Sequence, residues 1–82
     1  TPQQSIRRND AVRLIAKAIL PDLQQKKPDL TLAGARKQVR ARIVDAQNRT
    51  RRLPAGDPLP CSLLFRWAIE QKGWDTFETI FH

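Results

Sequence analysis

One stretch of the chain, residues 33–52, combines the spacing of a buried helix face with a concentration of positive charge. Apolar side chains recur here at intervals of three and four residues, which is the spacing of one helix face, and they are Leu32, Ala35, Val39, Ile43 and Ala46. Thr31 precedes them, and its hydroxyl is suited to accept a hydrogen bond from a first-turn amide. The pattern predicts a helix from Thr31 to about Arg49 that buries a single narrow stripe.

The rest of this predicted helix is strongly basic. Residues 33–52 hold seven of the fifteen Lys and Arg residues and one acid, Asp45, in a chain whose formal net charge is +7. On a helix the arginines fall on both flanks of the apolar stripe, with Arg36, Arg40 and Arg51 on one side and Arg42 and Arg49 on the other. A helix with a thin buried stripe between two basic flanks indicates a polyanionic partner.

The length and composition indicate one small domain. The chain has 82 residues, of which 40% are hydrophobic, and we expect residues 1–82 to form a single helical domain with a flexible segment at residues 1–8. No apolar run approaches the roughly 20 residues that span a bilayer, and the single cysteine, Cys61, excludes an internal disulfide. We therefore expect a cytoplasmic protein. The absence of an initiator Met suggests either processing or excision from a longer protein.

A first helix is predicted from Asn9 or Asp10, either of which is a good N-cap, to about Leu20. Pro21 disfavours helical geometry in the residue before it, so we expect the helix to end or kink there. Residues 22–29 are predicted to form a linker.

A proline-rich loop over residues 53–60 is predicted to follow the basic helix, and no segment alternates long enough to predict a strand. The next helix, residues 61–72, is predicted to begin at Pro60 or to be capped by Ser62. Its residues Leu64, Trp67 and Ala68 face one way, and Phe65 and Ile69 face nearly the opposite way. Asp75 is predicted to cap a short last helix. The fold class is therefore all-α, a compact bundle of three main helices plus a short C-terminal one.

The sequence offers no catalytic or metal-binding arrangement. The single histidine is the terminal His82, so Cys61 has no base within the domain to activate it. No Cys/His cluster has metal-ligand spacing, and the glycines are isolated. We expect a protein that is not an enzyme and uses no cofactor.

The segment Pro60–Ala68, PCSLLFRWA, resembles the recognition helix of helix-turn-helix DNA-binding families, especially the excisionase and MerR-like group. Ser62 matches the small hydroxyl residue at the helix start, Leu64 the core leucine, Arg66 the exposed arginine and Trp67 the core aromatic. The chain departs from the family pattern because a proline-rich loop precedes this helix where those families have a tight turn. The resemblance implies a helix-turn-helix-like fold in which helix 61–72 enters the major groove.

These observations predict a DNA-binding domain of a bacterial or phage transcriptional regulator or DNA-organising protein. The basic helix is expected to hold the phosphates of double-stranded DNA, and helix 61–72 to contact base edges. The expected phosphate-binding residues are Arg36, Lys37, Arg40, Arg49, Arg51 and Arg52, and the expected base-reading residues are Ser62 and Arg66. A homodimer on a two-fold site is compatible with this function.

Two alternatives stay open. The first is a protein-interaction or assembly module that binds an acidic partner through Phe65, Ile69 and the C-terminal aromatics. The second is RNA binding by the arginine-rich helix. A membrane is the least suited partner, because no predicted helix joins a basic face to a broad exposed apolar one.

Overall fold

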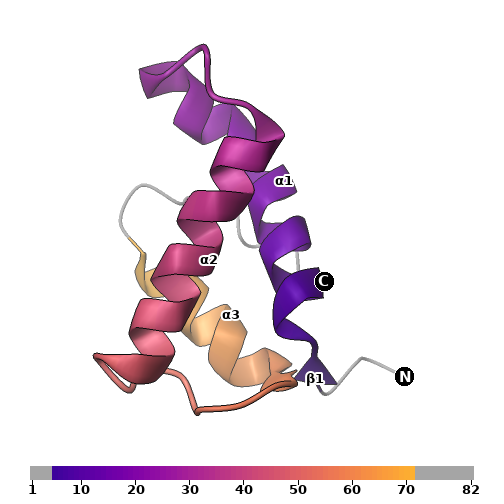
Figure 1. The fold of residues 1–82 in the computed structure, drawn as a ribbon, viewed down its shortest axis with the longest axis vertical. Helices are drawn as coiled ribbons and strands as arrows, with labels where there is room; N and C mark the ends of the chain where they lie inside the picture. Colours follow the sequence, from indigo (N-terminus) through magenta and orange to yellow (C-terminus); the bar gives the residue numbers. More distant parts are fainter. Residues whose placement is uncertain (1–4, 72–82) are drawn as a thin grey trace.

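The computed structural model describes residues 5–71, which form three helices and a two-stranded ribbon (Figure 1). In chain order the elements are β1 (Ser5–Ile6), α1 (Arg8–Lys26), α2 (Leu32–Asn48), β2 (Leu59–Pro60) and α3 (Cys61–Glu70). The described part of the chain is mostly helical, as predicted. The short last helix expected from Asp75 lies outside the described residues.

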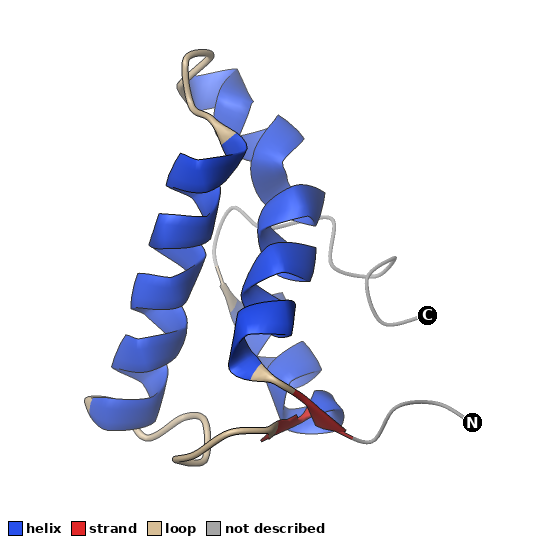
Figure 2. Ribbon diagram, turned by 45° about the vertical axis from the view of Figure 1, so that its right-hand side comes forward, coloured by secondary structure: helices blue, strands red, loops and turns tan. Residues whose placement is uncertain are grey.

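The core lies between α2 and the two other helices. α1 and α2 lie side by side, joined by a short loop, and α3 lies behind the lower half of this pair (Figures 1 and 2). The predicted stripe of α2 is buried, together with one face each of α1 and α3; the main buried side chains are Val12, Ile15, Ile19, Ala35, Val39, Ile43, Leu64, Trp67 and Ala68. The apolar spacing of α2 therefore identified its buried face correctly.

Of the two predicted outcomes at Pro21, an end or a kink, the end is wrong, because α1 continues to Lys26 and includes part of the expected linker. The proline removes one helical hydrogen bond, which by itself disfavours continuation. Continuation brings Leu20 and Leu23 against the core, and the Gln24 side-chain amide donates to the Leu30 carbonyl at 3.0 Å. We attribute the longer helix to these contacts, because tertiary packing can outweigh a local preference.

The ribbon was not predicted. β1 and β2 pair antiparallel, with Ser5 opposite Pro60 and Ile6 opposite Leu59. Ile6 and Leu59 are both buried in the core cluster. Regular structure therefore begins within residues 1–8, the segment predicted to be flexible. β2 leads directly into α3.

Helix caps agree with the sequence at α2 and differ at α1, and at α3 the predicted start near Pro60 is confirmed whereas the alternative cap, Ser62, is wrong. The Thr31 hydroxyl accepts from the Gly34 amide at 3.2 Å, which confirms this residue as the N-cap of α2. α1 begins at Arg8, so Asn9 and Asp10 lie inside the helix and do not cap it. Ser62 likewise lies inside α3, whose N-cap is Pro60 and which ends at Glu70, before the predicted residue 72.

Gln47 holds the loop that follows α2. Its side chain is only 6% exposed, and its Nε2 donates to the carbonyls of Pro54 at 3.0 Å and Gly56 at 2.9 Å. Its Oε1 accepts from Arg8 Nη1 at 3.2 Å. Gly56 has a φ of +105°, a conformation that residues with a Cβ rarely adopt. The loop is thus tied to the end of α2 and to the start of α1.

Candidate nucleic-acid interface

Three of the predicted phosphate-binding residues lie together on α2. Arg36, Lys37 and Arg40, with Ala33, line a shallow hollow of about 250 Å³. All three basic side chains belong to exposed residues. Helical spacing explains the grouping, because residues three and four apart are neighbours on a helix surface. The structure therefore joins these three residues into one cluster, which we call the α2 cation cluster.

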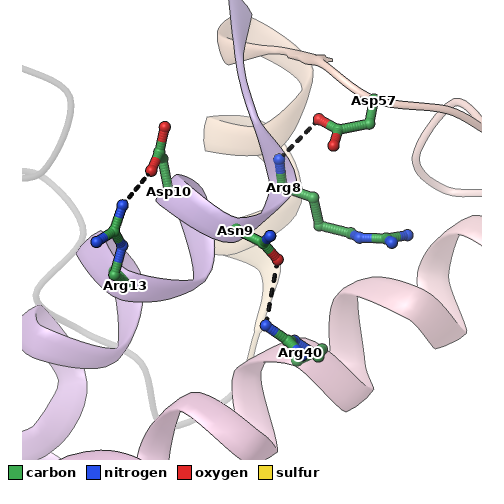
Figure 3. Close-up of polar contacts among 6 residues, drawn as sticks. All are labelled: Arg8, Asn9, Asp10, Arg13, Arg40 and Asp57. Carbon is green, nitrogen blue, oxygen red and sulfur yellow. Dashed lines mark hydrogen bonds and ion pairs between the residues drawn. The ribbon is translucent and has the colours of Figure 1, made fainter.

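The α2 cation cluster carries no internal charge compensation. Arg40 Nη2 donates to Asn9 Oδ1 of α1 at 3.1 Å, and this partner is neutral (Figure 3). Within residues 5–71, neither Arg36 nor Lys37 forms an ion pair; the ion pairs are Arg13–Asp10, Arg49–Asp45 and Arg52–Glu70. The positive potential of the cluster is therefore available to an anionic partner.

Arg49 and Arg52 are engaged with carboxylates. Arg49 Nε lies 3.4 Å from Asp45 Oδ1, and Arg52 Nη2 lies 3.6 Å from Glu70 Oε2. All four side chains are about half exposed or more, and ion pairs of this kind contribute roughly 0–1 kcal/mol. Exchange of either carboxylate for a phosphate therefore has a small energetic cost, but both acids lower the local positive potential.

Arg51 lies beyond the end of α2, so its predicted place on one flank of that helix is wrong. α2 ends at Asn48, and Arg51 has a φ of +54°, which lies in the left-handed region. Arg51 lines a hollow of about 460 Å³ with Asn48 and with residues 53–55 of the loop. A non-glycine residue in this conformation is uncommon, and such strain is concentrated at functional sites.

The two predicted base-reading residues are both exposed on α3. Arg66 lines a hollow of about 250 Å³ with Arg52, Leu63, Trp67 and Glu70, and Ser62 lies in the first turn. Trp67 is buried, as predicted for a core aromatic. α2 and α3 are joined by residues 49–60, including β2, so the tight turn typical of helix-turn-helix proteins does not connect these two helices.

The exposed apolar residues of α3 differ in part from those predicted. Ile69 is 52% exposed, in agreement with its expected outward position, and Phe65 is half-buried. Leu63 is 39% exposed and was not singled out from the sequence. Leu63 lies one helical turn before the exposed Arg66, and this spacing is the feature of the sequence that could have indicated its exposure.

Two polar residues, Asn9 and Asn48, lie beside predicted phosphate-binding residues and were not predicted to belong to the interface. Asn9 positions Arg40, and Asn48 lines the hollow beside Arg51. Asn9 was interpreted as a helix cap, whereas its partner is 31 residues away in the chain. Asn48 follows the buried residue Val39 by nine residues, which is two and a half helical turns, so the spacing would have placed Asn48 on the opposite, outward surface of α2.

Residues 5–71 contain no group of three His, Cys, Asp or Glu side chains arranged to hold a metal ion. Neither α1, α2 nor α3 combines the length and the apolar character that crossing a bilayer requires. Comparison with known protein families, curated proteins and solved structures found no match to this chain.

Proposed function

We propose that the chain is a DNA-binding domain, of the kind found in transcriptional regulators and DNA-organising proteins, that holds duplex phosphates with α2. The observation that carries this proposal is the α2 cation cluster, in which three exposed cations adjoin without an ion-pair partner among residues 5–71. Side chains of this type supply the sequence-independent part of DNA affinity, because phosphate contacts release bound counterions.

The proposed role of α3 in base recognition rests only on its resemblance to helix-turn-helix recognition helices. Ser62 and Arg66 are the residues that the resemblance assigns to base contacts, and both belong to exposed positions. The same helix carries the Glu70 carboxylate and the exposed side chains of Leu63 and Ile69. α2 holds four basic residues and one acid, whereas α3 holds one of each, so α2 has the stronger electrostatic argument for contact with a nucleic acid.

The test is the affinity for a random-sequence DNA duplex, measured by fluorescence anisotropy across a salt series. Three phosphate contacts predict an affinity that falls about 40-fold between 50 and 200 mM salt, and six predict about a thousandfold or more. The slope of log affinity against log salt concentration therefore gives the approximate number of cations that contact phosphates. Absence of binding at 50 mM salt would contradict the proposal.

A charge-reversal pair tests whether α2 is responsible. Arg36→Glu with Arg40→Glu should weaken binding by at least about tenfold at low salt and reduce the salt slope by about two. Lys17→Glu with Lys27→Glu changes the net charge equally at exposed residues outside α2 and serves as the matched control. Equal losses from the two pairs would show that net charge, rather than the α2 cation cluster, governs binding.

One observation favours the protein-interaction alternative. Ile69 is 52% exposed and Leu63 is 39% exposed on the same helix, which leaves apolar surface for a protein partner or a second copy. Under this function Ile69→Ser should lower self-association in sedimentation velocity without altering DNA affinity. A monomeric wild-type chain with strong DNA binding would count against it.

A further inference from the structure

The centre of the outward surface of α2 carries two exposed residues with short side chains, Ala41 and Asn48, and one long cation, Lys37. Gly34, Ala41 and Asn48 recur every seven residues, and a straight helix drifts only about 20° per seven residues, so the three lie along one line. Lys37 precedes Ala41 by four residues and lies beside that line. This line is opposite the buried stripe that includes Val39 and Ile43. Ala41 and Asn48 are exposed, and Gly34 is half-buried. Ala41 and Asn48 allow close approach of another surface to the backbone in the second half of α2.

Long basic side chains lie on both sides of this line. Arg36 and Arg40 are on the flank that faces α1, as the bond between Arg40 and Asn9 shows, and helical spacing puts Arg42 and Arg49 on the opposite flank. The acid on the outward surface, Asp45, is paired with Arg49 at 3.4 Å. The surface therefore has short side chains at Ala41 and Asn48, a basic side chain at each edge, and the Lys37 cation one turn before Ala41.

No other described element covers this surface. In Figure 1 α3 lies behind α2 and α1 lies to its right, and no described element crosses in front of α2. The 17 residues of α2 form a rod about 25 Å long, and a helix about 10–12 Å across fits the major groove of B-DNA, which is about 12 Å wide. α3 has only 10 residues and is therefore about 15 Å long.

We propose that α2, rather than α3, enters the major groove of duplex DNA. Ala41 makes the closest approach, Lys37 and Asn48 face base edges, and the flanking arginines contact phosphates on the two sides of the groove. The Asn48 amide and the Lys37 ammonium suit this position because Asn pairs with adenine and Lys with guanine there. This inference rests on the proposed DNA binding and adds which helix is inserted and which side chains meet the bases.

The experiment enlarges the centre of the surface without changing its charge. Ala41→Leu adds bulk at an exposed helical position, so the fold is retained, and circular dichroism checks this. If Ala41 lies against the floor of the groove, the added side chain should weaken duplex binding by about tenfold or more. Ala41→Ser, which adds a single oxygen, should bind within about threefold of the unaltered chain. Gln25→Leu, at an exposed residue of α1, is the control for an added surface leucine and should bind normally.

The outcomes separate the two proposals. Wild-type binding to duplex DNA together with undiminished binding by Ala41→Leu would overturn the insertion of α2 and leave the DNA-binding function intact. Absence of wild-type binding at 50 mM salt would overturn the function itself. A duplex of RNA provides a second readout, because its major groove is too narrow to admit a helix. Equal affinity for RNA and DNA duplexes would show that the cations contact phosphates from outside the groove, and would also overturn the inference.

Discussion

The Asp57 carboxylate accepts a hydrogen bond from the backbone N–H of Arg8 at 2.9 Å, although the two residues are 49 positions apart in the chain (Figure 3). The amide belongs to the first turn of α1, which has no capping bond from its own N-cap, Arg7. A side chain from the loop after α2 therefore satisfies the start of α1. The helix that supports Arg40 through Asn9 thus depends on a distant loop for its first turn.

Asp57→Ala should lower the free energy of unfolding by about 1 kcal/mol, because one first-turn amide of α1 loses its acceptor. Asp57→Asn retains an acceptor oxygen and should lose less. Urea denaturation measures both changes. Asp29→Ala, at an exposed carboxylate in the loop before α2, should leave stability unchanged within about 0.5 kcal/mol. A loss at position 57 no greater than at position 29 would contradict the capping role.

Gln47→Leu should destabilise the protein by about 2 kcal/mol, because the carbonyls of Pro54 and Gly56 lose their buried donor. The shape of the side chain is nearly conserved, so the change isolates its hydrogen bonds. Gln38→Leu, at an exposed position of the same helix, is the matched control for thermal denaturation. Similar melting temperatures for the two variants would show that the Gln47 bonds contribute nothing to stability.

Gly56→Ala should destabilise the protein by about 1–2 kcal/mol, since Gly56 has a φ of +105°. A Cβ at this position meets no atom within 4 Å, so the expected cost comes from the backbone alone. Gly34→Ala provides the contrast, because its Cβ would approach Leu30 Cδ1 at 2.8 Å, a flexible side-chain end, within a helical turn. We expect that variant to stay within about 1 kcal/mol of wild type. A larger loss of stability in urea denaturation for Gly34→Ala than for Gly56→Ala would contradict this account.

Arg51→Gly should leave stability unchanged or raise it by up to about 1 kcal/mol, because glycine adopts the φ of +54° without a steric penalty. The same variant should weaken DNA binding by a few fold, since one cation is lost. Arg49→Gly is the comparison: its φ of −97° is ordinary, so glycine there should only destabilise. A clear loss of stability at position 51 would show that the Arg51 side chain itself supports the loop.

Much of the helical core was predictable because it depends on local spacing. The stripe of α2 that includes Ala35 and Val39 is buried, the Thr31 cap is formed, and Leu64 and Trp67 face the core from α3. Three members of the predicted interface, Arg36, Lys37 and Arg40, also meet on one surface for the same reason. Arg51 could not be placed in this way, because its position depends on where α2 ends.

The sequence by itself determined which faces of its helices are apolar and where its positive charge is concentrated, because helical periodicity fixes both from residues a few positions apart. The tertiary structure decided the features that join distant parts of the chain. These are the β1–β2 pairing, the capping of Arg8 by Asp57, the burial of Gln47 and the continuation of α1 past Pro21. Each depends on a partner brought close only when the chain is folded, and its local sequence carries no periodic signal for that partner.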